Sequence, residues 1–289
     1  MTSSNNPVAS AILAVYNAES TIVSCLESLV AQTVPIEIII VDDGSTDTTT
    51  TGIIKVLGSH KYKLLKQSHS GPAIARNFGA DHANSPILLF VDADMVFDKD
   101  YVRDLIQPIL NYSRATAKLK ERSVGTYTTE ERVSNWDNVW ARCWNIQEGW
   151  QDKKRFPQNP PKRGTDFRAI LKSEFDRVGG FDHLGYTDTW SLFSKLGVRP
   201  LSTRAICYHQ NPSSLSAVFA QARWSAKRPY KYALLGALYA LLRTTLPVSL
   251  IVGFAKFYKE PFFVKFKLVY DLGRFVGILE MLLFGKLTK

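Results

Sequence analysis

Two clusters of acidic side chains each follow directly after an apolar run. The first follows Ile36–Val41 and reads Asp42-Asp43-Gly44-Ser45-Thr46-Asp47; the second follows Pro86–Val91 and reads Asp92-Ala93-Asp94. A carboxylate at a buried strand end is costly unless a partner compensates its charge. Because Asp92 and Asp94 are two residues apart, an extended backbone would send both side chains to the same side. There they would suit a hard divalent cation that bridges substrate phosphates.

The same residue types also favour another interpretation, because Asp and Ser are common in solvated turns and at helix N-caps. One such cluster leaves the two interpretations balanced. Two clusters at successive strand ends favour a binding site.

The apolar runs indicate which elements must position these acids. Four of them are short and continuous, and segments with helical spacing separate them: Val8–Val15, Ile36–Val41, Tyr62–Leu65 and Pro86–Val91. Continuous strands alternating with helices predict a parallel sheet covered on both faces. We therefore expect an α/β nucleotide-binding fold whose ligands gather at the carboxyl ends of the strands.

The second half of the chain is less regular between residues 99 and 160. Beyond it, Thr165–Leu171 and Arg204–Tyr208 are expected strands, and Asp188–Leu196 is an expected helix. Trp136, Trp140, Trp144 and Trp150 lie near helical spacing, which favours core packing over sugar stacking.

Charge is distributed unevenly along the 289 residues. The chain has 36 Lys+Arg against 26 Asp+Glu, a net charge of +10, but residues 1–222 hold 24 and 23 while residues 223–289 hold 12 and 3. The near-neutral body offers no basic stripe with interleaved aromatics, so nucleic-acid binding is not expected. Three widely spaced cysteines predict neither a disulfide framework nor a zinc site, and a reducing compartment is the simplest expectation.

The basic tail also holds the longest apolar stretches. Ala233–Phe254 is long enough to span a bilayer, but Arg243 and Pro247 within it favour a re-entrant or interfacial arrangement. Phe262–Phe284 carries more charges, and Lys267, Asp271 and Arg274 fall on one helical face, which predicts a helix lying in the membrane interface. Residues 229–289 are therefore expected to be a membrane-associating region on the cytoplasmic face of the cell membrane; whether 233–254 spans is left open.

Two further motifs complete a pattern with the acidic clusters. They are Ala14-Val15-Tyr16-Asn17 and Gly71-Pro72-Ala73-Ile74-Ala75-Arg76-Asn77-Phe78-Gly79. In this order and spacing, the four motifs resemble the family 2 glycosyltransferases of the GT-A fold. Val178-Gly179-Gly180-Phe181-Asp182 and Thr187-Asp188 also resemble that family, and the predicted catalytic domain is residues 1–228.

The resemblance implies roles for individual residues. Ala14, Tyr16, Asn17, Asp43, Arg76, Asp92 and Ala93 would bind the nucleotide sugar, a UDP- or GDP-sugar. Asp94, Asp92 and His209 would hold Mg²⁺ or Mn²⁺, which neutralises charge on the leaving nucleoside diphosphate. Asp188 would be the general base that takes a proton from the acceptor hydroxyl, with inversion at the anomeric carbon. Arg223, Lys227 and Arg228 would bind the donor diphosphate or lipid phosphates.

The implied function is sugar transfer to a lipid-linked or surface-glycan acceptor. The family usually has Glu before the base, where this chain has Thr187, which keeps a catalytically inactive scaffold open. Gln221-Ala222-Arg223-Trp224 is one residue shorter than the motif of processive synthases, which favours single-sugar transfer. A polyprenyl-phosphate sugar synthase of the same fold and a non-enzymatic basic membrane- or nucleic-acid-binding protein are alternatives. A dehydrogenase is disfavoured because no GxGxxG follows the first strand.

Overall fold

The computed structural model describes residues 6–112, 123–161, 164, 166–183 and 188–285, with the backbone alone for Asp188 and Thr189. The strands in these ranges are β1 (Ala9–Val15), β2 (Ile36–Asp42), β3 (Tyr62–Lys66), β4 (Ile87–Asp92), β5 (Met95–Phe97), β6 (Gly125–Val133), β7 (Ala169–Leu171) and β8 (Leu201–His209). The helices are α1 (Ile22–Val30), α2 (Thr49–Leu57), α3 (Pro72–Asp81), α4 (Tyr101–Tyr112), α5 (Val139–Glu148), α6 (Lys172–Arg177), α7 (Asp188–Leu196), α8 (Leu215–Ala226), α9 (Ala233–Leu242), α10 (Leu246–Ala255) and α11 (Phe263–Phe284).

The described strands form one sheet in the order β3-β2-β1-β4-β7-β6-β8-β5. Its first four strands are parallel, as the continuous apolar runs predict, and Ala14 of β1 is in register with both Val41 and Asp92. The carboxyl ends of β1, β2 and β4 therefore meet at one edge. Both acidic clusters begin at that edge.

The sheet is mainly parallel, as expected from sequence, and β6 and β8 are also parallel to each other, but its second half includes antiparallel pairs. β7 pairs antiparallel with β4 and β6, and β5 pairs antiparallel with β8. Residues 99–160, which look less regular in sequence, contain α4, β6 and α5. The reason is visible at β6, where polar and charged side chains such as Glu131 are buried and paired, so the strand has no continuous apolar run.

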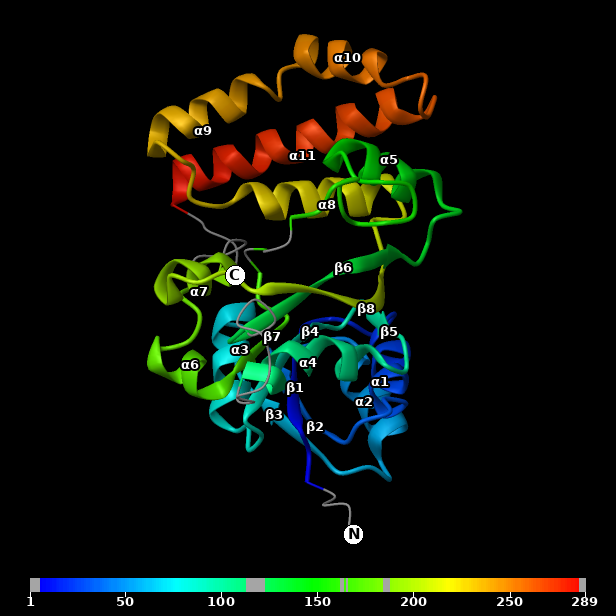
Figure 1. Ribbon diagram of the computed structural model, residues 1–289. Coiled ribbons are helices and arrows are strands. Elements are labelled where there is room, and N and C mark those ends of the chain that lie inside the picture. Colours follow the sequence, from blue (N-terminus) through cyan, green and yellow to red (C-terminus); the bar gives the residue numbers. More distant parts are fainter. Residues whose placement is uncertain (1–5, 113–122, 162–163, 165, 184–187, 286–289) are drawn as a thin grey trace.

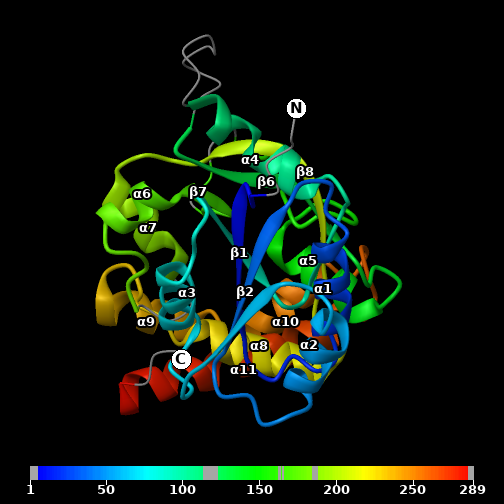
Figure 2. The ribbon, with the colours of Figure 1, turned by 90° about the horizontal axis from the view of Figure 1, so that it is seen from below.

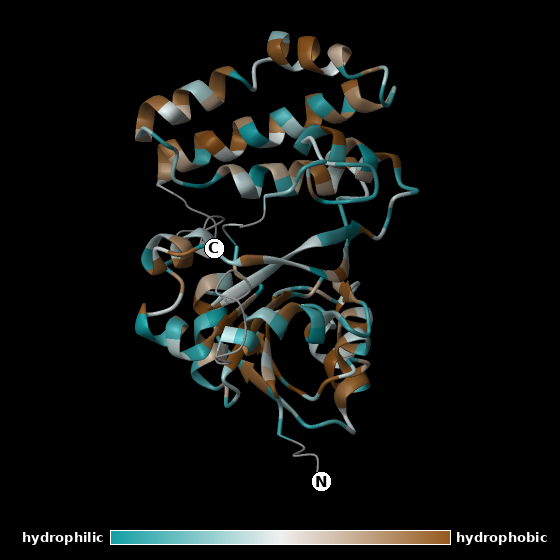
Figure 3. Ribbon diagram, viewed as in Figure 1, coloured by the Kyte–Doolittle hydropathy of each residue, from teal (hydrophilic) through white to brown (hydrophobic). Residues whose placement is uncertain are grey.

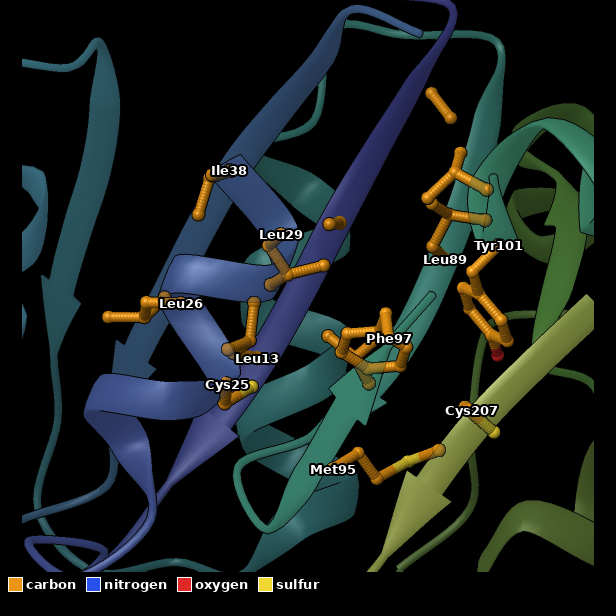
Figure 4. Packing of buried hydrophobic residues seen from close by; sticks show 14 of the residues in the cluster. Leu13, Cys25, Leu26, Leu29, Ile38, Leu89, Met95, Phe97, Tyr101 and Cys207 are labelled. Carbon is orange, nitrogen blue, oxygen red and sulfur yellow. The ribbon is translucent and has the colours of Figure 1, made fainter. Parts of the chain in front are cut away.

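Helices cover both faces of the sheet (Figure 2). On one face, α1, α2 and α4 pack on β1, β2 and β4 in a core that includes Leu13, Leu26, Leu29 and Tyr101 (Figure 4). On the other face, α3, α6 and α7 pack around Phe90, Phe175 and Phe181. The strand ends are thus fixed between two rigid layers.

The C-terminal helices lie on the opposite side of β6 and β8 from the main body of the sheet (Figure 1). α11 packs along α8, because Gly273 and Gly277 allow close contact: a Cβ on Gly273 would meet the Phe219 carbonyl oxygen at 2.6 Å, and one on Gly277 would meet the Arg223 carbonyl. Trp144 of α5 packs against Tyr270 with ring centroids 5.6 Å apart. This packing confirms a core role for that tryptophan.

The polar face expected on the last helix does not face water. Lys267 and Asp271 are buried, the lysine Nζ lies 2.7 Å from an Asp271 carboxylate oxygen, and Ser249 of α10 donates to the same carboxylate at 2.6 Å. The expectation that this polar face is exposed is wrong, because α9 and α10 cover it (Figure 1). A polar stripe among apolar residues can face another helix as well as solvent.

α9 and α10 meet at an angle of 64°. In the described part of the chain, no single helix has the length and apolar composition needed to cross a membrane, whereas these two helices meet that requirement together as a bent pair. Many of their large apolar side chains are exposed, and hydrophobic residues predominate in both (Figure 3).

Candidate active site

A small hollow lies at the carboxyl ends of β1 and β2. Its volume is about 170 Å³, and Ala14, Tyr16, Asp43, His69 and Trp224 contribute to its lining. The rings of Tyr16 and His69 are stacked with centroids 4.0 Å apart. Aromatic faces beside a buried carboxylate are suited to a planar base that also carries N–H donors.

Asp43 is the polar centre of this hollow. One carboxylate oxygen accepts from Gln67 Nε2 at 2.7 Å and Ser70 N at 2.8 Å, and the other accepts from Gly71 N at 2.9 Å and lies 2.9 Å from His69 Nδ1. Gly71 has φ +95°, a conformation that favours glycine, and it places its N–H on Asp43 immediately before α3 begins at Pro72. The start of α3 therefore fixes the carboxylate.

The remaining acids of the first cluster have structural roles. Asp42 accepts from Ser45 N and Thr50 Oγ1, and Asp47 accepts from Thr49 N and Glu19 N. These are the turn and capping contacts that the alternative interpretation of the sequence anticipates. Only Asp43 of this cluster lines the hollow.

Asn17 belongs to the same turn. Its Oδ1 accepts from Thr46 N at 2.8 Å, and its own N–H donates to Ser45 Oγ at 3.0 Å. Its side chain is exposed and does not line the hollow. Asn17 therefore holds the loop that follows β2.

Asp92 is held by two arginines. Its Oδ1 accepts from Arg76 Nη2 at 2.8 Å and its Oδ2 accepts from Arg168 Nη1 at 2.8 Å. Burial alone would raise the pKa of Asp92, but the charges of Arg168 and Arg76 outweigh burial and hold the pKa well below its usual range. Asp92 is therefore a carboxylate whose two oxygens are both engaged by guanidinium groups.

Asp94 takes a different partner. Ala93 and Asp94 form a tight turn between β4 and β5, so the extended backbone assumed from the sequence does not extend past Asp92. Asp94 Oδ2 lies 2.9 Å from His209 Nε2, and the other ring nitrogen of His209 lies 2.7 Å from Glu131 Oε1. Burial and the charge of Arg155 would lower the pKa of His209, but Asp94 and Glu131 raise it.

Glu131 links the two aspartates through the interior. It lies 3.4 Å from Arg168 Nη2 and 3.3 Å from Arg155 Nε, besides its contact with His209. Burial would raise the pKa of Glu131, but Arg155 and His209 hold it well below its usual range. The carboxylates and cations thus form one continuous network.

Asp94 Oδ2 and His209 Nε2 contact each other, so a divalent cation held by both would have to take the place of this contact. Glu131 fixes the ring of His209 from behind, as a carboxylate does for metal-bound histidine. The described residues contain no group of three or more His, Cys, Asp or Glu arranged for a metal. Phosphate oxygens and water would therefore have to complete the coordination, as is usual for Mg²⁺.

Comparison with known proteins places this site in a family. Residues 10–179 match the model of glycosyl transferase family 2, which is more than half of the chain. The chain belongs to glycosyltransferase family 2. The family consists of transferase enzymes, and the match includes both acidic clusters and Arg168.

A relative in Streptococcus pneumoniae, glycosyltransferase GlyA, is 36% identical over 104 residues, which is 35% of this chain but only 15% of GlyA. Two solved structures share the fold. A mannosyltransferase from Pyrobaculum calidifontis, in complex with GDP-Man and Mn²⁺, aligns with TM-score 0.61 at 18% identity and covers 97% of this chain and 88% of its own. TarS residues 1–349 from Staphylococcus aureus, in complex with UDP-GlcNAc, aligns with TM-score 0.56 at 15% identity over 96% and 92%.

Several residues of this glycosyltransferase lie away from the hollow. Arg76, Asp92 and Ala93 do not line it. Arg223 and Lys227 form ion pairs with Glu280 of α11, and the Lys227–Glu280 distance is 2.6 Å.

The expected general base lies at a helix start. Asp188 begins α7, as predicted, but its side chain and the whole of Thr187 are outside the described residues. Its role as general base therefore stays a prediction.

The sequence argument missed His69, Glu131, Arg168 and Trp224 as parts of the site. Trp224 lies in the Gln-Ala-Arg-Trp motif, which is the one signal that could have identified it. Glu131 and Arg168 are brought to Asp92 and His209 by pairing of β6 and β7 with their neighbours, and no local motif marks them.

Proposed function

We propose that this chain is an inverting glycosyltransferase that uses a UDP- or GDP-sugar and a divalent metal. The observation that carries the proposal is the pairing of Asp94 with His209 beside the Asp43 hollow. Asp92, two residues before Asp94, is in register with Ala14 of the hollow. A nucleotide base in the hollow would leave its diphosphate directed along the strand ends toward Asp94.

The residues of the hollow would bind the donor base. Tyr16 and His69 offer ring faces, and Trp224 closes the lining from α8. The carboxylate of Asp43 accepts from four groups, of which His69 is the most exposed, so a base N–H would take the place of that contact. This would couple base binding to a movement of the His69 ring.

Asp94 and His209 would hold the metal, and we assign Asp92 to the positioning of Arg76 and Arg168 instead. Bound Mg²⁺ or Mn²⁺ would neutralise charge developing on the leaving nucleoside diphosphate. The structures of two fold neighbours contain UDP-GlcNAc and GDP-Man with Mn²⁺, which supports donors of this class.

Asp188 would take the proton from the acceptor hydroxyl as that oxygen attacks the anomeric carbon. A carboxylate placed opposite the leaving group acts as a general base in such a displacement, worth about 10²–10⁴-fold in rate. A single displacement inverts the anomeric configuration. The acceptor would be lipid-linked or a surface glycan, and the enzyme would act at the cytoplasmic face of the membrane; the basic tail and the exposed apolar side chains of α9 and α10 support this.

The test is thermal stabilisation by UDP- and GDP-sugars with and without Mn²⁺, because a bound donor raises the melting temperature by mass action. Asp94→Asn should abolish the Mn²⁺-dependent part of the shift. Asp104→Asn, which removes an exposed carboxylate from α4, should retain it. An equal shift with Mn²⁺ and with a chelator would contradict the metal assignment.

For the base, Asp188→Asn should retain the donor-induced shift and lose transfer by about 10²-fold or more. Asp176→Asn, on the exposed side of α6, is the matched control. Turnover by Asp188→Asn at the wild-type rate would exclude Asp188 as the base.

A further inference from the structure

A second and larger cavity lies outside the candidate active site, between the α9–α10 pair and α11. Its volume is about 860 Å³. Six of its lining residues are cations, and we call it the cationic cavity: Arg228, Lys231, Arg243, Lys256, Lys267 and Arg274. Among the described residues, the carboxylates that line it are Glu148 and Asp271.

The six cations of this cavity outnumber the two carboxylates among its described lining residues. Asp271 is already engaged by Lys267 and Ser249. Within the described ranges no ion pair joins Lys231, Arg243 or Arg274 to a carboxylate. Their heads lie instead over aromatic rings, as Arg243 does over Tyr239 at 5.9 Å.

Lys256 is similarly placed. Its Nζ donates to the Ile146 carbonyl oxygen at 2.9 Å and lies 5.4 Å from the ring centre of Phe263. Burial, and then the neighbouring charges of Lys267 and Lys259, lower its pKa. Cations gathered without enough carboxylates are expected to bind an anion, and phosphate accepts from several donors at once.

The helices that cover the cationic cavity expose an apolar surface on the outside. Ile251 is 70% exposed, and Leu242, Leu246 and Phe254 are each 63% exposed. An unshielded apolar surface of this kind marks an interaction site, and next to a cationic cavity it suits a membrane containing anionic lipid. A soluble anion would use the cations alone and leave this surface unexplained.

We propose that the cationic cavity binds the phosphate-bearing headgroup of a membrane lipid, with the lipid chain lying against the exposed apolar surface of α9 and α10. The cavity and the hollow of the candidate active site are close along the chain. Trp224 of α8 lines the hollow, and Arg228, two residues after α8 ends, lines the cationic cavity. Lipid binding there is separable from sugar transfer, because it requires no nucleotide.

The test compares two double variants of the full chain that each remove two positive charges from the tail. Arg243→Gln/Arg274→Gln alters the cationic cavity; Lys259→Gln/Lys265→Gln alters two exposed lysines that do not line it. Binding is measured by sedimentation with phosphatidylcholine vesicles that contain either phosphatidic acid or oleic acid, matched in surface charge.

We expect wild-type protein to prefer the phosphatidic acid vesicles. The cavity variant should lose about tenfold more affinity for them than the control variant does. Both variants remove two positive charges, so each loses the same generic attraction to the anionic surface, about 1 kcal/mol per charge. Equal losses in the two variants would show a non-specific basic surface and overturn the proposal. Equal affinity for phosphatidic acid and oleic acid vesicles would also overturn it.

Two further measurements complete the test. Titration with inorganic pyrophosphate without vesicles separates a soluble-anion site from a lipid site; binding as tight as that of the vesicles would overturn the proposal. If the double variant melts early, Arg243→Gln alone, which changes an exposed side chain, should still weaken binding more than Lys259→Gln does. Donor-induced stabilisation of the same proteins shows separately whether the proposed transferase function holds.

Discussion

The two acidic strand ends of this glycosyltransferase look alike in sequence but are stabilised in different ways. At the end of β2, Asp43 accepts from backbone N–H groups, an amide and a histidine that all lie within residues 67–71. At the end of β4, Asp92 is held by guanidinium groups from Arg76 and from Arg168, which is 76 residues away. The first depends on local backbone geometry and the second on charge brought together by the sheet.

This difference teaches that a buried carboxylate can be satisfied by hydrogen-bond donors or by opposite charge, with different consequences. Donors on the backbone persist after substitution of side chains. Arg168 forms ion pairs with both Asp92 and Glu131. Its removal therefore leaves two carboxylates without this neutralising charge.

The largest effect on stability is therefore expected at Arg168. Arg168→Met should lower the free energy of unfolding by about 3 kcal/mol at neutral pH, because two half-buried or buried carboxylates lose their shared cation. Urea denaturation measures this, with Arg168→Lys expected to be intermediate and the exposed Arg177→Met nearly neutral. A loss below about 1 kcal/mol for Arg168→Met would mean that Arg76 alone balances Asp92.

A smaller loss is expected at Asp43. Asp43→Asn keeps one acceptor oxygen but sets an NH₂ group against donors such as Gly71 N, which should cost about 2 kcal/mol in unfolding free energy. It should also weaken stabilisation by nucleotide sugars. If Asp43→Asn destabilises as much as Arg168→Met, the proposed contrast between the two strand ends is wrong.

Low pH should reduce the loss of unfolding free energy that Arg168→Met causes. The pKa values of Asp92 and Glu131 are lowered in the folded protein, so their stabilising contribution is present above their unfolded values, near 4, and is lost as the pH falls below them. The difference in unfolding free energy between wild type and Arg168→Met should therefore decrease by about 1 kcal/mol between neutral pH and pH 3. His209, whose pKa is raised, loses its contribution at the other end, as the pH rises above about 6.5. A gap that stays constant from neutral pH to pH 3 would contradict the charge argument.

The smallest effect is expected at the partly buried ion pairs that Glu280 makes in the tail. Arg223 and Lys227 lower the pKa of Glu280 to about 2, so the pairs stabilise the protein above pH 4.5 and lose this effect as the pH falls toward 2. Glu280→Gln should cost less than about 1 kcal/mol in unfolding free energy, since ion pairs that water still reaches contribute little and the Gln oxygen can still accept from Arg223. Thermal melts in low and high salt measure it; a loss comparable to that of Arg168→Met would show that the tail network is as important as the one behind β4.

The parallel half of the fold and the residues at its strand ends could be predicted because their signals are local. Val8–Val15 and Pro86–Val91 are continuous apolar runs, and acids or small residues at the strand ends mark the edge where the candidate site lies. His209 could be suggested only through the family resemblance. It is 115 residues from Asp94 in sequence, and the antiparallel pairing of β5 with β8 brings the two side chains together.

The rest could not be predicted because it depends on contacts between distant segments. Glu131 lies in a strand with several charged neighbours, which in sequence is typical of an exposed surface, yet it is buried against Arg168 and His209. In the same way, the sequence around Lys267 and Asp271 is typical of a solvent-exposed helix face, yet α10 covers both residues. Burial of a charge is decided by its partner, which local spacing does not identify.

The glycine-mediated contact between α8 and α11 has a consequence for how this protein unfolds. Val218 and Ala222 of α8 are buried with Phe263 and Phe266 of α11, so the composition change near residue 228 does not coincide with a gap in packing. The catalytic part and the tail should form one cooperative unit and lose structure in a single transition. A chain cut at residue 228 would therefore expose the apolar side of α8, next to Trp224, rather than yield an intact catalytic domain.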